Sequence, residues 1–184
     1  MTGREIVVGV TGGIAAYKTA ALVSQLVQAG AGVTVVMTEA AAEFVGPATF
    51  AALTGRPVVS RVFAQEHPLG AHIDLAERAD LFCVAPATAN FLAKAAVGLS
   101  DDLLTTLLLS FAGTVVVAPA MNSAMWAKAA VQRNVEQLRR DGFVLVEPEE
   151  GWLSCRTQGV GRMAAPEVIR AVIEAQIKAI SDRR

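Results

Sequence analysis

Short runs of β-branched residues alternate along most of this chain with longer stretches rich in alanine and leucine. The runs with the character of strands are residues 6–10, 33–37, 81–85, 114–118 and 143–146. Three of them are almost wholly apolar, which is typical of parallel strands covered on both faces. The predicted helices are residues 15–29, 89–96, 103–109, 126–141 and 167–180. This alternation predicts an α/β fold: a doubly wound, Rossmann-like parallel sheet with flavodoxin-type layering and helices on both faces.

Glycine and proline mark the ends of several of these elements. Gly30 and Gly142 stand where helix C-terminal caps are expected, and Pro166 suits the first turn of the last helix. Residues 147–163 have no clear period and are predicted to form a loop or flap, a kind of segment that is often functional. No linker or repeat divides the 184 residues, so one domain, 1–184, is expected. Whether it is the N-terminal part of a longer bifunctional chain stays open.

The balance of charged and apolar residues excludes several classes of protein. Sixteen Lys and Arg against 17 Asp and Glu give a formal net charge of −1, which would hold neither nucleic acid nor an anionic membrane. The 53% hydrophobic content, with 18% charged residues, excludes intrinsic disorder and suggests that other subunits cover part of the surface. Two cysteines exclude a disulfide scaffold and a cysteine-rich metal module, and no metal site is predicted.

One charge-free stretch, residues 103–127, is long enough on paper to cross a bilayer. Gly113, Pro119 and Asn122 interrupt it, so it is predicted to form a buried helix, a turn, a buried strand and a loop. The chain begins without the basic start and apolar core of an export signal. We therefore expect a soluble, cytoplasmic protein.

In an open parallel sheet, ligands bind beyond the carboxyl ends of the strands. The first strand is followed by Gly12, Gly13 and Ile14, a glycine turn that runs into a helix. Its amides and the positive end of the helix dipole could receive a phosphate, or the turn could only pack helix against strand. Thr38 follows the second strand, where a dinucleotide-binding fold places an acid for the ribose. A hydroxyl at that position favours a mononucleotide phosphate over NAD.

The third strand is followed by small and polar residues. Small side chains let the backbone approach a flat ligand, and the polar ones could contact its rim, although Thr88 could equally be an ordinary helix N-cap. The candidate cofactor contacts at this strand end are Ala87, Thr88, Ala89 and Asn90.

After the fourth strand, Asn122 could bind a carboxylate, and Met121 or Trp126 could lie beside an aromatic cofactor. The alternative is a helix-capping asparagine followed by methionine and tryptophan of the core.

Taken together, the strand ends resemble one family. The segments that carry the resemblance are Thr-Gly-Gly-Ile-Ala-Ala-Tyr-Lys (11–18), Met-Thr-Glu-Ala-Ala (37–41), Pro-Ala-Thr-Ala-Asn (86–90) and Pro-Ala-Met-Asn-Ser-Ala-Met-Trp (119–126). Over nearly its whole length the chain is similar to the homo-oligomeric flavin-containing cysteine decarboxylases. The resemblance implies an FMN cofactor, with its phosphate near Gly12, Gly13 and Thr38 and further contacts from Ile14 and residues 87–90. It also implies a trimer, or a dodecamer built of trimers, in which neighbouring subunits share each active site.

The resemblance also assigns catalytic roles. His72 falls at the position of the family's active-site histidine, which assists deprotonation in the oxidative step, although a lone histidine before an apolar helix is more often a cap or core residue. Cys155 resembles the cysteine on a mobile clamp that supplies a proton in the reductive step. Asn122 would hydrogen-bond the departing carboxylate, with Met121 and Met125 also in contact with the substrate.

Three further positions bear on this assignment. Residue 156 is Arg where the relatives usually have Gly, so the resemblance does not predict the shape of the clamp here. Cys83, inside a predicted strand, is expected to be a small buried hydrophobe. His67 is expected to be solvated.

The activity implied by the resemblance is decarboxylation of 4′-phosphopantothenoylcysteine to 4′-phosphopantetheine and CO2 in coenzyme A biosynthesis. A cysteine carboxylate has no electron sink. Oxidation of the thiol to a thioaldehyde supplies one, so that CO2 can leave to give an enethiolate, which reduced FMN then reduces. A synthetase that makes this substrate, fused or separate, is the expected partner.

Two alternatives to this activity stay open. A peptidyl-cysteine decarboxylase of the lantibiotic type stops at the enethiol and would not need Cys155. A non-catalytic, flavin-binding regulatory subunit would need none of His72, Asn122 and Cys155.

Overall fold

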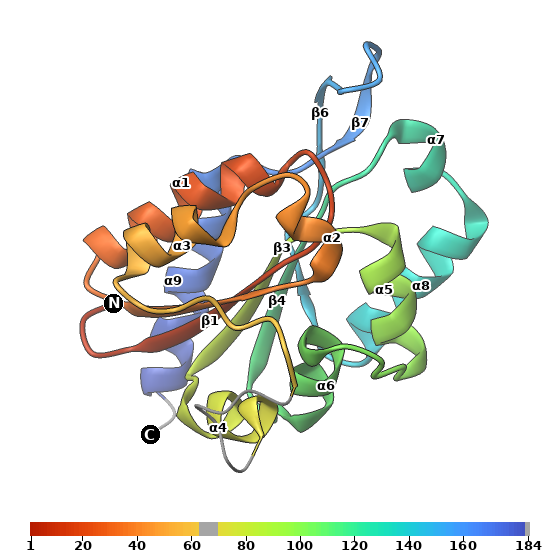
Figure 1. The fold of residues 1–184 in the computed structure, drawn as a ribbon. Helices are drawn as coiled ribbons and strands as arrows, with labels where there is room; N and C mark the ends of the chain where they lie inside the picture. Colours follow the sequence, from red (N-terminus) through yellow and green to blue (C-terminus); the bar gives the residue numbers. More distant parts are fainter. Residues whose placement is uncertain (63–69, 183–184) are drawn as a thin grey trace.

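The computed structural model describes residues 1–62 and 70–182, and within them the fold is built on a five-stranded parallel sheet (Figure 1). His67 lies outside the described residues. In spatial order the strands are β2 (Gly32–Met37), β1 (Glu5–Val10), β3 (Leu81–Ala87), β4 (Thr114–Pro119) and β5 (Val144–Leu145). Every pairing is parallel, so the predicted doubly wound α/β fold is confirmed. At the outer edge of β2, Val59 forms a parallel bridge to Val36.

Helices cover both faces of the sheet, which is why its strands are apolar without interruption. One face packs against α1 (Ala16–Gln28), α3 (Pro47–Thr54) and α9 (Pro166–Asp182), whose buried residues join Ile6, Val8 and Val10 in one core. The other face packs against α4 (Ala71–Arg78), α5 (Ala89–Val97), α6 (Leu103–Ser110) and α8 (Ala129–Arg140), around Phe82 and Val84. All seven residues of β3 are buried, so the middle strand belongs to both cores.

Several predicted ends of helices and strands agree with the structure. Gly30 and Gly142 follow α1 and α8 with φ of +86° and +87°, the left-handed conformation that glycine adopts without strain. Pro166 begins α9. The charge-free stretch 103–127 divides into α6, a turn, β4 and a loop with the short helix α7 (Ser123–Trp126). No helix of the described part is long and apolar enough to cross a membrane.

One predicted helix was wrong in detail, and a region with further helices was missed. The single helix over 126–141 is broken: α7 ends at Trp126, Lys128 is extended with ψ of 132°, and α8 begins at Ala129. Between residues 38 and 80, where no helix bounds were predicted, the structure has α2 (Glu39–Ala42), α3 and α4.

The predicted loop at 147–163 is largely an antiparallel hairpin of β6 (Glu149–Trp152) and β7 (Gln158–Arg162), which projects from the carboxyl end of the sheet (Figure 1). The hairpin docks at its base, where the amide of Met121 donates to the Gly161 carbonyl over 2.9 Å. At Gly161 φ is +138°, and a Cβ there would lie 2.2 Å from the Met121 carbonyl oxygen, so only glycine allows this approach. The segment is therefore a flap with regular structure.

Candidate active site

A cavity of about 1120 Å³ opens at the carboxyl ends of the strands, between the sheet and the hairpin. The loops after β1, β2, β3 and β4 line it, and the hairpin closes one side. The predicted site residues that it brings together are Gly12, Gly13, Ile14, Thr38, Thr88, Ala89, Asn90, Met121, Asn122, Met125 and Cys155. Residues distant in the sequence thus meet at one end of the sheet, as expected for this class of fold.

The glycine turn after β1 is fixed by its contacts with neighbouring loops. A Cβ on Gly12 would lie 2.4 Å from that of Ala40, so the close approach of the first two loops requires glycine. The Thr11 hydroxyl donates to the Pro86 carbonyl over 2.6 Å and accepts from the Thr88 amide over 3.1 Å, which ties the loops after β1 and β3 together. Within the described residues, the amides of Gly12, Gly13 and Ile14 have no hydrogen-bond acceptor. The turn therefore presents donors to the cavity.

Thr38 and Thr88 each cap a helix and also line the cavity. The Thr38 hydroxyl accepts from the Ala41 amide over 3.3 Å at the start of α2, and the Thr88 hydroxyl accepts from the Phe91 amide over 3.4 Å at the start of α5. The helix-cap interpretation of Thr88 is therefore correct, and it does not exclude a contact with a ligand. Ala87, by contrast, is fully buried in the core and does not line the cavity, so its predicted cofactor contact is not supported.

Asn122 uses only half of its amide group within the protein. Its Oδ1 caps α7 by accepting from the Met125 amide over 2.8 Å. The side-chain NH2 carries two donors and has no partner within the described residues. Asn122 lines the cavity, so these donors are available to a ligand there. Met121 and Met125 lie beside it on the cavity wall, whereas Trp126 packs against the core.

Cys155 lies in the turn at the tip of the hairpin and lines the cavity. The turn is closed by two backbone hydrogen bonds of 2.9 Å, from Leu153 to the Thr157 carbonyl and from Arg156 to the Leu153 carbonyl. The thiol is exposed, and its Sγ is 3.0 Å from Thr157 Oγ1. Cys83 is buried as predicted, and burial raises the pKa of its thiol to about 12, so it is chemically inert.

His72 is not brought into the cavity. It is the second residue of α4, which precedes the amino-terminal end of β3 and lies at the opposite end of the sheet from the hairpin (Figure 1). Its Nδ1 is buried without a hydrogen-bond partner within the described residues. The resemblance placed His72 in the active site, and within one chain the structure does not.

Several charged residues of the cavity were not predicted as site residues. Lys94 bridges Asp101 over 2.6 Å and Asp102 over 3.3 Å, and these contacts, with that to Asp101 foremost, raise the pKa of its ammonium group. Lys18 and Arg162 line another part of the wall. Lys18 lies in a segment that carries the resemblance, but nothing in the local pattern distinguishes a cavity lysine from a solvated one. The described residues contain no group of His, Cys, Asp and Glu arranged to hold a metal ion.

A family model described as Flavoprotein matches residues 1–178. The chain belongs to the Flavoprotein family. Curated relatives of this flavoprotein include the coenzyme A biosynthesis bifunctional protein CoaBC of Bacillus subtilis, 48% identical over 95% of this chain and 43% of the relative. The protein of the same name from Mycobacterium tuberculosis is 47% identical over 93% of this chain and 41% of the relative. The chain thus spans less than half the length of these relatives.

Solved structures of flavoproteins agree with this fold over almost the whole chain. The FMN-dependent cysteine decarboxylase SpaF has a TM-score of 0.86 and 34% identity, covering 98% of both chains. A cysteine-to-serine mutant of PPC decarboxylase, complexed with pantothenoylaminoethenethiol, also has a TM-score of 0.86, with 27% identity over 94% of this chain and 97% of that chain.

Proposed function

We propose that this chain is an FMN-dependent carboxy-lyase that converts 4′-phosphopantothenoylcysteine to 4′-phosphopantetheine and CO2 in cytoplasmic coenzyme A biosynthesis. One observation carries the proposal. The same cavity is lined by the glycine turn, by Asn122 and by Cys155, which is 33 residues further along the chain. The CoaBC relatives and the PPC decarboxylase neighbour support the substrate. Because those relatives are longer, we also propose that 1–184 is the N-terminal domain of a bifunctional chain whose other part, or a separate enzyme, synthesises the substrate.

The cavity fits FMN in its donor groups and in its volume. The amides of Gly12, Gly13 and Ile14 have no acceptor within the described part of the chain, and Thr38 lies across the turn from them, a donor set suited to a phosphate. Thr88, Ala89 and Asn90 would lie along the ring system. The cavity of about 1120 Å³ exceeds the roughly 300–1,000 Å³ typical of one small ligand, so it has room for cofactor and substrate together. When bound, FMN would supply two-electron oxidation of the substrate thiol and the return of those electrons.

In this proposal the protein holds the substrate at both reacting groups. The free NH2 of Asn122 donates a hydrogen bond to the substrate carboxylate and positions it to leave as CO2. The exposed Cys155 thiol, held above the cavity by the hairpin turn, protonates the product carbon. The hairpin covers the site and limits its access to water.

We propose that His72 acts in the cavity of a neighbouring subunit of a trimer, alone or as part of a dodecamer. Within the described residues its Nδ1 has no hydrogen-bond partner, so no contact there assigns the ring a structural role. Beside it on α4, Ile73 is 39% exposed, and Leu109 on the packed helix α6 is 57% exposed, an apolar surface suited to contact with another subunit. In a neighbour's site the ring would assist deprotonation of the substrate thiol.

The alternatives are less well supported. A peptidyl-cysteine decarboxylase that stops at the enethiol would not use a thiol poised over the cavity, and the CoaBC relatives cover almost all of this chain at nearly half identity. A regulatory flavin-binding subunit would not require Asn122 to keep its NH2 free.

Purification followed by a turnover assay tests this function. The protein should be yellow, release FMN on denaturation, elute as at least three chains, and form CO2 and 4′-phosphopantetheine from 4′-phosphopantothenoylcysteine. FAD, NAD or no nucleotide after reconstitution would contradict the cofactor. FMN-loaded protein that forms no CO2 would favour the regulatory alternative.

A further inference from the structure

Two cations, Lys18 and Arg162, line the cavity at the base of the hairpin. Lys18 lies on α1, and its ammonium group donates to the Met163 carbonyl over 3.2 Å, which brings it next to the end of β7. Arg162 is the last residue of β7 and precedes Met163. One helix and one hairpin strand thus contribute positive charge to the same part of the wall.

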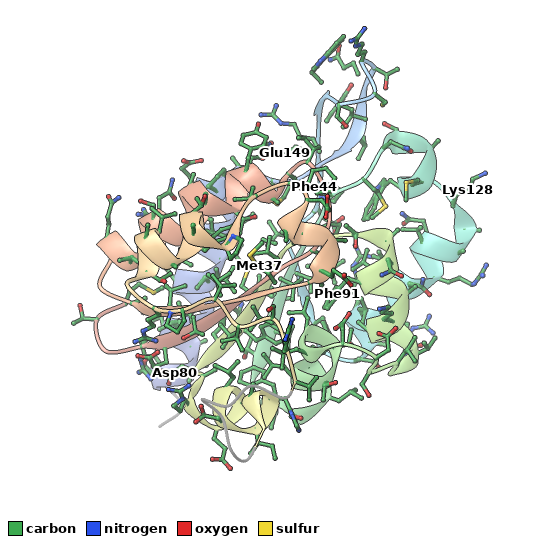
Figure 2. All side chains as sticks on the ribbon, viewed as in Figure 1. Met37, Phe44, Asp80, Phe91, Lys128 and Glu149 are labelled. Atoms are coloured by element: carbon green, nitrogen blue, oxygen red, sulfur yellow. The ribbon has the colours of Figure 1, made fainter. Side chains whose placement is uncertain are left out.

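Neither cation is neutralised as Lys94 is. Within residues 1–62 and 70–182, Lys18 and Arg162 form no ion pair, whereas Lys94 in the same cavity bridges two aspartates. Burial, and then repulsion from Arg162, lower the pKa of Lys18 in spite of the attraction of Glu149. Glu149 lies at the foot of the hairpin beside α1 (Figure 2), and one of its oxygens is engaged by the Ala165 amide over 3.0 Å. Two mutually repelling cations with one partly engaged counter-charge are a site for an anion.

The substrate's dimensions indicate which anion reaches this place. Between its cysteine and its phosphate lies about four residue lengths of extended chain, or roughly 14 Å. From Gln158, near the tip that carries Cys155, to Arg162 at the base, β7 spans four residue steps, or about 13 Å. A substrate whose cysteine lies under Cys155 and whose arm follows β7 therefore places its phosphate at the hairpin base. The acidic wall formed by Asp101 and Asp102 would repel it.

We propose that Lys18 and Arg162 form the subsite for the terminal 4′-phosphate of the substrate and set the preference for phosphorylated over unphosphorylated pantothenoylcysteine. This rests on the proposed function. An ammonium and a guanidinium together supply both a point charge and the planar pair of donors that phosphate accepts. The cofactor's phosphate has a separate set of donors, the amides after β1.

Kinetics of FMN-loaded protein test the subsite. The ratio of kcat/KM for 4′-phosphopantothenoylcysteine to that for pantothenoylcysteine should fall at least about tenfold in Lys18→Gln and in Arg162→Gln, because each loses a charge-assisted contact. The kcat/KM for the unphosphorylated substrate should change little. Lys18→Arg should keep most of the preference. The matched control is Lys128→Gln, since Lys128 is exposed on the α7–α8 connection outside the cavity (Figure 2), and it should keep the parental ratio.

A second measurement identifies which phosphate is bound. Affinities of the apoprotein for FMN and for riboflavin should keep their parental ratio in Lys18→Gln and Arg162→Gln. If that ratio falls instead, the two cations hold the cofactor's phosphate and the proposal is overturned. An unchanged substrate ratio in both variants also overturns it, while the decarboxylase function stands. Parental protein that decarboxylates neither substrate refutes the proposed function, and the subsite with it.

Discussion

Asn122 divides its amide between two tasks: the oxygen caps α7, and the NH2 faces the cavity. Asn122→Asp keeps an acceptor for the Met125 amide, because aspartate is an equally good N-cap. It places a negative charge where the substrate carboxylate should bind. We expect FMN content and thermal stability close to the parent and a loss of kcat/KM of at least about a hundredfold, since the lost bond is charge-assisted and repulsion is added. Stopped-flow and steady-state assays measure this, and near-parental turnover at full FMN occupancy would refute the role.

Cys155→Ser separates proton donation from packing. The side-chain volumes are similar, so a cysteine that only packs the hairpin turn should be replaceable. A hydroxyl is a much poorer acid than a thiol, whose ordinary pKa is about 8.5. We expect about one CO2 per site under anaerobic conditions and accumulation of the enethiol, detected by mass spectrometry as about two mass units lighter than 4′-phosphopantetheine. Parental amounts of 4′-phosphopantetheine at the parental rate would remove the donor role.

Arg156, the departure from the family pattern, adopts φ of +61° in the hairpin turn. This left-handed conformation costs an ordinary L-residue about 1 kcal/mol, is easier for asparagine and is worst for β-branched residues. Arg156→Asn should therefore slow hydrogen exchange of the Leu153 amide about threefold, and Arg156→Val should speed it by at least as much. Equal exchange rates in the three proteins would show that the turn does not control opening of the hairpin.

Most of the predicted site residues that line the cavity lie in segments that follow strands, and strand ends meet at one edge of a parallel sheet. Ala87 does not line the cavity because β3 continues through it, two residues beyond the predicted end of the strand. Lys18 and Arg162 were missed because their shared position depends on how the hairpin docks on α1, a long-range contact without local signature. For His72 the resemblance supplied a role that a single chain cannot show.

At the scale of elements, α6 depends on its N-terminal cap. Asp102 accepts from the Thr105 amide and hydroxyl, each over 2.8 Å, and pairs with Lys94. Burial opposes its ionisation, but these contacts together lower the pKa of Asp102. Its contribution to stability is therefore complete above the unfolded-state pKa of about 3.9 and is lost as the pH falls through the folded-state pKa.

Asp102→Asn keeps a capping oxygen but cannot titrate. The free energy of unfolding should fall by about 0.5–1 kcal/mol near neutral pH, because the charged contact with Lys94 is lost. The difference from the parent should shrink as the pH falls below about 3.9 and vanish below the folded-state pKa. Urea unfolding of the FMN-loaded protein between these pH values measures it. A difference that stays constant with pH would mean that the charge of Asp102 does not stabilise the fold.

The sheet strands were predictable from their continuous apolar runs, whereas the other elements needed information from across the molecule. Lys128 carries no glycine or proline signal, yet the chain breaks there because α7 and α8 pack in different places. The strands of the hairpin are mostly exposed or half-buried, and their sequences, Glu-Glu-Gly-Trp and Gln-Gly-Val-Gly-Arg, do not alternate between apolar and polar side chains. Their position is set by the contact of Gly161 with Met121.

At the scale of the whole molecule, shared active sites predict rescue between two inactive variants. His72→Asn and Asn122→Asp should each be inactive as homo-oligomers. Co-expressed in equal amounts, they should recover about a quarter of parental activity, because about one site in four would combine an intact His72 with an intact Asn122 from a neighbour. A CO2 assay of the whole co-expressed pool measures this. After tandem purification of differently tagged subunits has removed homotrimers, about one site in three of a mixed trimer should be intact. No recovery in proven hetero-oligomers would mean that both residues act within one chain.

The two edges of the main sheet also determine how copies of this protein can associate. On one side, Val59 donates to the Val35 carbonyl over 3.0 Å and accepts from the Met37 amide over 3.1 Å, so the outer edge of β2 is already occupied there. On the other side, β5 offers only two residues. Neither edge gives a long unpaired row of backbone donors and acceptors, so strand-to-strand polymerisation is disfavoured. A protein with 53% hydrophobic residues can therefore bury apolar helix surface in a closed assembly without growing into open-ended aggregates.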